Sequence, residues 1–318
     1  MDMSVVAVGR EDDSPVEEPL RVAVLADRLG YGEVWAGEGP TWDAFVLATA
    51  IGAATERVAL TAGPVPVHVR DPLTVVRGAA SAAAVTGRSV GVALGTSGKR
   101  VVEGVHGRQR TRPAATLAHG AAAVRELMDG LPGEPVVPGS GFPRRLPPPG
   151  GSLTVAAFGE RAVAAAVAHA DRMLLDIVSP GQVRMLRERM LAAARKAGRT
   201  PPRLAAWLPA AVDPGPEAVT QILRSVAGFL AVPGYSDMFV DAGFAEVVEL
   251  AVKGADRDTL VRALPPEAAA TVALVGDTAA VRARIDAYAE AGLDEIALVP
   301  ATAGDPAGER TLTALAPG

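Results

Sequence analysis

A turn rich in glycine and hydroxyl side chains lies at Gly91–Arg100 (GVALGTSGKR), where an apolar run ends. Gly95 would let a ligand approach the backbone closely, because glycine has no Cβ atom. Thr96 and Ser97 offer hydroxyl and N–H groups to the oxygen atoms of a phosphate. Considered alone, this pattern is more typical of a plain loop than of a binding site.

A second candidate anion site lies at Ala156–Val163 (AAFGERAV), where Gly159 separates an apolar run from a helical one. The unpaired N–H groups at the start of a helix attract anions whatever the nearby side chains are. The alternative is a tight turn that joins a strand to a helix and binds nothing.

A third segment, Leu60–Pro72 (LTAGPVPVHVRDP), contains the pair Gly63-Pro64 directly after a strand-like run. A peptide bond before proline adopts the cis form at modest cost. A cis bond here would push a backbone bulge toward whatever lies at the strand end. The alternative is a trans proline that simply ends the strand.

A carboxylate, Glu38, lies just past another strand-like run, in Val34–Phe45 (VWAGEGPTWDAF). At a strand end it could orient a ligand or act as an acid or a base. The alternative places Glu38 at the surface, with Asp43 as the cap of the following helix.

Composition excludes several classes of function. The formal net charge is −5 and the basic residues are spread along the chain, which argues against nucleic acid as the main partner. The chain has no cysteine, so disulfides, thiol catalysis and thiolate metal sites are excluded. The four histidines lack metal-binding spacing, so we expect no metal. The N-terminus does not resemble a signal peptide and no apolar run is long enough for a membrane span, which predicts a cytoplasmic protein.

Short apolar runs alternate with longer alanine-rich amphipathic runs along the chain. The predicted strands are Ser4–Val8, Glu33–Ala36, Val58–Ala62, Ser89–Leu94, Thr154–Ala157, Met173–Val178, Ala205–Ala211 and Glu295–Val299. The predicted helices are Glu17–Leu29, Trp42–Thr55, Pro72–Val85, Ala114–Met128, Glu160–Ala170, Pro180–Ala197, Pro216–Leu230 and Thr278–Ala291. This alternation predicts a parallel sheet with crossover helices, closed into a (β/α)₈ barrel; an open doubly wound sheet is the alternative.

We expect residues 1–318 to form a single domain, with two segments that depart from the alternation. Leu131–Gly151 is rich in proline and glycine, which predicts a long irregular loop. Val232–Ala269 carries helical patterns without a clear strand, which predicts a helical insertion before the last βα unit. Such insertions commonly decorate the ligand-binding end of a barrel.

The four candidate segments, in this order and each at a predicted strand end, resemble the luciferase-like flavin and deazaflavin oxidoreductases. VWAGEGPTWDAF followed by TERVAL is similar to their VW-x-x-E…DAF…T-x-R-I-x-L stretch, and Leu60–Pro72 is similar to LGTGV…R-x-P. Gly91–Gly107 (GVALGTSGKRVVEGVHG) is similar to GLGTSSPxVVEGWHG, which is characteristic of the actinobacterial-type branch that uses the deazaflavin coenzyme F420. Val232–Phe239 and Val275–Pro300 resemble later signatures of that branch.

The resemblance implies a TIM-type barrel with the cofactor at the C-terminal end of the strands. It implies a cis peptide after the third strand, which falls at Gly63-Pro64 and would support the central ring of the cofactor. The phosphate-bearing tail would then lie across Gly95–Ser97 and the turn at Gly159-Glu160.

The implied reaction is hydride transfer between coenzyme F420 and a C=C, C=N or C=O bond of a small organic substrate. Glu38 is the first candidate for the proton donor and His106 the second; alternatively, His106 is a loop residue that holds Glu103 or a phosphate. Some relatives have histidine where this chain has Gly39, and the family's tryptophan before His106 is Val105 here.

Two other functions stay open at this point. One is a monooxygenase on the same fold that uses FMN and needs a reductase partner. The other is a degenerate barrel that binds a ligand or a sister subunit without catalysis, which the replaced histidine and tryptophan would explain. The resemblance also implies a homodimer through helices near the second and third βα units, where Ala79, Ala80, Ala83 and Ala84 form a small-residue face that fits plain barrel packing equally well.

Overall fold

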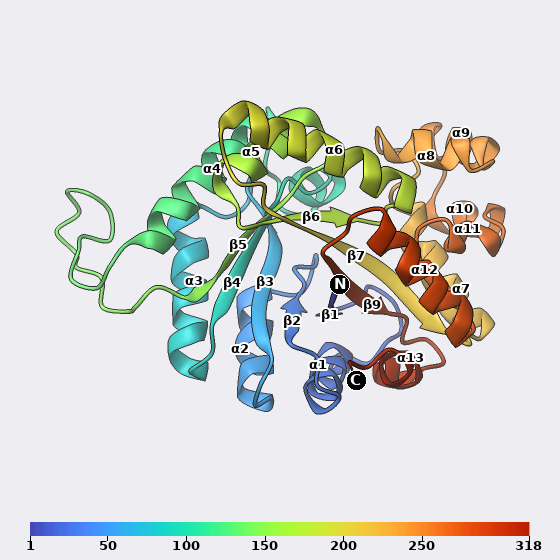
Figure 1. Cartoon of the computed structure of the whole chain (residues 1–318), viewed down its shortest axis with the longest axis horizontal. Helices are drawn as coiled ribbons and strands as arrows, with labels where there is room; N and C mark the ends of the chain where they lie inside the picture. Colours follow the sequence, from blue (N-terminus) through green and yellow to red (C-terminus); the bar gives the residue numbers. More distant parts are fainter. Residues whose placement is uncertain (318) are drawn as a thin grey trace.

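Eight parallel strands close into a barrel within residues 1–317, the part of the chain that the computed structural model describes (Figure 1). They are β1 (Asp2–Ala7), β2 (Glu33–Ala36), β3 (Ala59–Pro66), β4 (Val90–Gly95), β5 (Gly150–Ala156), β6 (Arg172–Asp176), β7 (Arg203–Val212) and β9 (Glu295–Pro300). β1 pairs with β2 and β9, and β7 pairs with β9 and β6, which closes the ring. The predicted (β/α)₈ barrel is confirmed, and the open doubly wound alternative is wrong.

The barrel strands are apolar along nearly their whole length because both of their faces are covered. β4 reads VGVALG and is buried at every position, as expected for a parallel strand between a barrel interior and a layer of helices. The covering helices are α1 (Glu18–Arg28), α2 (Ala44–Ala54), α3 (Pro72–Thr86), α4 (Pro113–Asp129), α5 (Glu160–His169), α6 (Pro180–Ala197), α7 (Pro216–Ala227) and α12 (Thr278–Glu290). Their alanine and valine faces pack on the outside of the strands and form the main core.

The helices begin and end where their capping residues dictate. The Asp43 side chain accepts hydrogen bonds from the first-turn N–H groups of α2, and Asp71 and Ser179 do the same for α3 and α6. Gly87 and Gly198 adopt the left-handed conformation that ends α3 and α6. The expected capping role of Asp43 is therefore present.

The barrel interior is filled in layers of side chains, as is usual for this architecture. At the N-terminal end, Arg172 pairs with Glu33 and Glu295, both at 2.8 Å, and its guanidinium stacks over the Trp35 ring at 4.1 Å. The layer above is apolar and consists of Val6, Trp35, Ala93, Leu174, Ala205 and Ala297. Val8, Ala156, Trp207 and Val299 pack on top of it, toward the C-terminal ends of the strands. The interior is thus closed at the bottom, so a ligand can enter only from the top.

Four elements depart from the sequence-based expectation. β8 (Leu274–Gly276) is a three-residue strand that extends the end of β7, and a run so short gives no periodic signal. A π-helical turn, η1 (Arg100–Val105), follows the β4 turn. η2 (Pro306–Gly308) and α13 (Glu309–Ala314) follow β9 and supply its helix.

The two irregular segments have the expected character. The chain between α4 and β5 has a single isolated bridge, Pro135 to Pro143, and projects from the barrel in Figure 1. Between α7 and β8 lie four short helices, α8 (Tyr235–Asp241), α9 (Ala245–Val252), α10 (Arg257–Ala263) and α11 (Glu267–Ala270). In the described part of the chain, no helix combines the length and apolarity needed to cross a membrane.

Candidate functional site

The bulge in β3 packs against the end of β4 at the C-terminal rim of the barrel. The Gly63–Pro64 peptide is cis, as predicted, and the register of β3 against β4 shifts between Ala62 and Val65. Gly63 has φ of 117°, and a Cβ atom there would lie 2.4 Å from the Ala93 carbonyl oxygen, so only glycine fits. A Cβ atom on Gly95, which is buried, would lie 3.3 Å from Pro64 Cβ. The missing side chain of Gly95 therefore lets the end of β4 pack closely against Pro64.

The turn after β4 is held by an arginine that sequence reasoning missed. Arg110 donates from Nε to the Ser97 carbonyl oxygen at 2.7 Å and from Nη2 to Thr96 Oγ1 at 3.2 Å. Ser97 adopts φ of 52°, a left-handed conformation that is uncommon for a residue with a side chain. Because Arg110 lies 13 residues beyond Ser97 in an irregular loop, no local pattern indicates this contact.

The N-terminus of α5 follows β5, the strand that neighbours β4. Gly159 is the N-cap residue and has no side chain to bond the first-turn N–H groups, while Glu160 is exposed in the first turn. Leu94 of β4 pairs with Val155 of β5, so the two turns leave neighbouring strands on the same rim. The structure thus brings together Gly95–Ser97 and Gly159-Glu160, as the sequence predicts. Both turns offer backbone donors for an anion.

Glu38 is held in a buried ion pair. Its carboxylate accepts from Arg70 Nε at 3.0 Å, from Arg70 Nη2 at 2.8 Å and from the Ala44 N–H at 2.8 Å. The side chain is 8% exposed, so the alternative that placed Glu38 at the surface is wrong. Asp43 also binds Arg70 at 2.8 Å; burial would raise the pKa of Asp43, but this hydrogen bond and those from backbone N–H groups lower it overall. The acid–base role of Glu38 stays a prediction, and these contacts favour instead a role in joining the β2 and β3 loops.

His106 lies on the exposed side of the turn that follows η1. Its side chain makes no hydrogen bond to residues 1–317, and the adjacent Val105 is 51% exposed. Glu103, the expected partner of His106, instead accepts from the Arg110 N–H at 3.2 Å. The role of His106 as a proton donor stays a prediction.

A carboxyl group at the end of β6, Asp176, was not singled out from the sequence. Arg172 and Leu174 point into the barrel, so the alternation of a strand directs Asp176 inward at the top. Burial raises the pKa of Asp176 to about 7, and the hydrogen bond from the Ile177 N–H only partly opposes this. An acidic residue directly at the end of the apolar run RMLLD was a signal that could have found it.

Asp176 has polar neighbours that also face the barrel mouth. Trp207 pairs with it across β6 and β7, and the Trp207 indole nitrogen is buried without a hydrogen-bond partner in the described residues. The Tyr235 hydroxyl, from α8 in the helical insertion, donates to the Asp176 carbonyl oxygen at 2.8 Å. Burial raises the pKa of Tyr235, and the neighbouring Asp176 carboxyl adds to that shift. The insertion thus covers this side of the rim.

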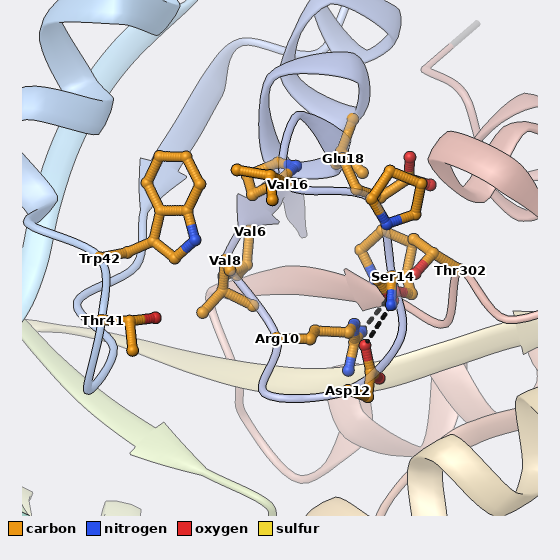
Figure 2. A pocket seen from close by; sticks show the side chains of 15 residues that line it. Val6, Val8, Arg10, Asp12, Ser14, Val16, Glu18, Thr41, Trp42 and Thr302 are labelled. Atoms are coloured by element: carbon orange, nitrogen blue, oxygen red, sulfur yellow. Dashed lines mark hydrogen bonds between the residues drawn. The ribbon is translucent and has the colours of Figure 1, made fainter.

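A pocket of about 390 Å³ opens on the opposite side of the rim, beside the ends of β1 and β9. Figure 2 shows Val6 and Val8 of the barrel interior at its base, Trp42 on one side and the Arg10–Asp12 loop on the other. Arg10 Nη2 donates to the Pro300 carbonyl oxygen at 2.7 Å. Residues 1–317 contain no group of three or more histidine, aspartate or glutamate side chains placed to hold a metal ion.

The chain matches a known protein family. A family model described as luciferase-like monooxygenase matches residues 1–295. The chain belongs to the luciferase-like monooxygenase family. No curated protein sequence matches this member of the family.

Solved structures share the fold of this family member over almost the whole chain. The F420-dependent tetrahydromethanopterin reductase from Methanopyrus kandleri has a TM-score of 0.82 at 16% identity, with coverage of 99% of this chain and 98% of that chain. An F420-dependent secondary alcohol dehydrogenase in complex with an F420–acetone adduct has a TM-score of 0.77 at 16% identity, with coverage of 98% and 97%. The oxygenating constituent of 3,6-diketocamphane monooxygenase from Pseudomonas putida, in complex with FMN, has a TM-score of 0.67 at 15% identity, with coverage of 99% and 96%. Both cofactor types therefore occur on this fold.

Proposed function

We propose that this luciferase-like protein is an oxidoreductase that transfers a hydride between coenzyme F420 and an unsaturated bond of a small organic substrate. The observation that carries the proposal is the placement of two turns rich in backbone donors on the neighbouring strands β4 and β5, beside the Pro64 bulge of β3. TM-scores of 0.82 and 0.77 to two F420-dependent enzymes, against 0.67 to an FMN-containing monooxygenase, support F420 over FMN.

The residues at the rim fit such a cofactor. Pro66 and Gly95 end the neighbouring strands β3 and β4, and the ring of the cofactor would lie above this part of the rim. The unpaired Trp207 indole N–H needs an acceptor, and ring carbonyl oxygens are acceptors. The uncapped N–H groups of α5 and the turn at Ser97 suit the phosphate of the tail. Lys99, next to this turn, is exposed and adds positive charge.

When bound, the reduced deazaflavin ring supplies the hydride to an unsaturated carbon of the substrate. The protein must supply a proton to the other atom of the reduced bond. We propose Asp176 for this role, because its pKa of about 7 keeps the carboxyl group protonated up to neutral pH at the mouth of the barrel. The apolar layer below, with Trp35 and Leu174, excludes water from the reacting bond.

The proposal is tested by titrating the purified protein with F420 and, separately, with FMN. We expect micromolar affinity for F420 and weaker binding of FMN. Gly95→Leu should abolish F420 binding because its side chain would displace the Pro64 bulge at the rim, whereas Gly95→Ala is the matched control and fits with minor adjustment. Tighter binding of FMN would favour the monooxygenase. Binding of neither cofactor would contradict the proposal and favour the degenerate barrel.

We also propose a homodimer, as the family resemblance implies. Ala79 and Ala80 are buried within the protomer, so they serve barrel packing and cannot form its contact surface. On the same helices, Val46 of α2 is 65% exposed and Val85 of α3 is 73% exposed. These exposed valines, with Ala84, favour a contact surface across α2 and α3.

A further inference from the structure

The pocket of about 390 Å³ beside β1 and β9 contains two hydrogen-bond donors that the protein leaves largely unused. The Arg10 guanidinium has five N–H donors. Its one hydrogen bond to the described part of the chain goes to the Pro300 carbonyl oxygen at 2.7 Å. The Thr302 hydroxyl, two residues further along, is buried and has no partner within residues 1–317. Both groups therefore require an acceptor, and both line the same pocket.

The rest of this pocket is mainly apolar. Figure 2 shows Val6, Val8 and Val16 around it, with the Trp42 ring as one wall. Trp42 packs so closely on Gly9 that a Cβ atom there would lie 1.9 Å from Trp42 Cδ1, which fixes the wall in place. An apolar chamber with a few convergent polar groups is typical of a site for a small molecule.

Two carboxylates that line the same pocket determine which kind of ligand can accept hydrogen bonds there. Asp12 accepts from the Ser14 N–H at 3.0 Å and the Gln221 amide at 2.9 Å, and Glu18 accepts from Arg21 at 3.4 Å. Both carboxylates are thus hydrogen-bonded within the protein, and both keep their charges near Arg10. Burial lowers the pKa of Arg10, and Asp12 and Glu18 oppose that shift, so the guanidinium already has its charge balanced. A ligand carboxylate would add a further negative charge to a wall that holds one cation and two anions.

We propose that this pocket is the substrate subsite and that it binds a neutral, mainly apolar molecule through a carbonyl oxygen, which accepts from Arg10 and Thr302. The substrate class would then be ketones, enones or esters rather than carboxylic acids. This inference rests on the proposed function, because hydride transfer to a carbonyl carbon, or to a C=C bond conjugated with it, is assisted by a donor at the oxygen atom. The π bond of the C=C or C=O group would break as the hydride adds to carbon. The proton would come from Asp176 when it adds to carbon, and from bulk water when it adds to the oxygen atom held by Arg10 and Thr302.

The test uses three probes with the same ring: cyclohex-2-enone, cyclohexene and cyclohex-1-ene-1-carboxylate. Each is titrated into the full-length protein by calorimetry, at pH 7.5 and without added cofactor. The chain has no cysteine, so no thiol can add to the enone. We expect the enone to bind at least tenfold more tightly than either of the other probes.

Variants separate the two donors. Arg10→Met should weaken enone binding about tenfold, as loss of a hydrogen bond from a charged donor does, and should leave cyclohexene binding within about twofold. Thr302→Val, which keeps the shape of the side chain, should weaken enone binding about threefold. Arg28→Met, on the exposed face of α1 away from the pocket, is the matched control and should bind as the wild type does. Circular dichroism confirms that each variant is folded.

Three results would overturn the inference: tighter binding of the carboxylate than of the enone, unchanged enone affinity in folded Arg10→Met and Thr302→Val, or no measurable binding of the enone. Titration of the same proteins with F420 makes the two proposals distinguishable. If the wild type and Arg10→Met bind F420 equally but fail the enone series, the subsite is misassigned and the proposed function stands. If neither protein binds F420 while the three probes bind as expected, the proposed function is wrong and the assignment of the pocket stands.

Discussion

Asp176→Asn tests whether burial at the barrel mouth raises the pKa of the Asp176 carboxyl group in the folded state. Burial raises its pKa from 3.8 to about 7. A gap of roughly three pKa units corresponds to about 4 kcal/mol of stability. Below about pH 4 the Asp176 carboxyl group is protonated in both the folded and the unfolded state, so it does not lower the free energy of unfolding. As the pH rises toward 7, the unfolded state ionises first, and this residue progressively destabilises the fold.

The measurement is urea unfolding of wild type and variant at several pH values between 5 and 8. Asparagine does not ionise, so the free energy of unfolding of Asp176→Asn, relative to wild type, should rise by about 3 kcal/mol over this range. Any fixed effect of the amide itself shifts the whole curve without changing its slope. Asp237→Asn, an exposed carboxyl on α8, is the control for the change of charge.

Parallel curves for wild type and Asp176→Asn would refute the reasoning, because they would mean that the carboxyl group ionises in the folded state as easily as in water. The same variant then tests the mechanism. If Asp176 supplies the proton, turnover should fall on the order of 100-fold or more while F420 affinity stays the same. Turnover close to that of the wild type would mean that Asp176 does not supply the proton. The predicted effect of Asp176 on the pH dependence of stability would not be affected by that result.

Further predictions concern Gly95, the turn, the barrel base and the dimer. Gly95→Leu, if circular dichroism shows it folded, should lose F420 binding, whereas Gly95→Ala should bind within a few-fold of wild type, as measured by titration. Arg110→Ala should weaken F420 binding about tenfold, because it removes the hydrogen bond that holds the turn at Ser97. Binding equal to that of the wild type would contradict the placement of the site at this turn. Arg172→Met should cost about 3–5 kcal/mol in urea unfolding, because it leaves the buried Glu295 and the partly buried Glu33 without a cation; a loss under 1 kcal/mol would contradict this. Sedimentation at micromolar concentration should give a dimer that Val85→Asp dissociates, and a wild-type monomer would disprove the association.

The alternation of apolar and amphipathic runs by itself determined a parallel sheet with crossover helices, whereas closure into a barrel is shown by the pairings of β1 with β9 and of β6 with β7. Each strand–helix unit is encoded locally, since periodicity, capping residues and terminal glycines act over a few neighbouring positions. For the same reason the turns at Gly95–Ser97 and Gly159, and the pair Gly63-Pro64, can be recognised from the residues around them. Their gathering on one rim follows from strand direction alone, because parallel strands all end on the same side.

Only the tertiary structure decided which side chains are free to act there. Glu38 looked like an available acid, but Arg70, 32 residues away, pairs with it. Arg110 supports the β4 turn from a loop that has no pattern of its own. No motif includes Arg10, and closure of the barrel sets it against Pro300, 290 residues away. Whether a charged side chain is paired, buried or open to a ligand depends on neighbours brought close by chain closure, and sequence spacing carries no record of those neighbours.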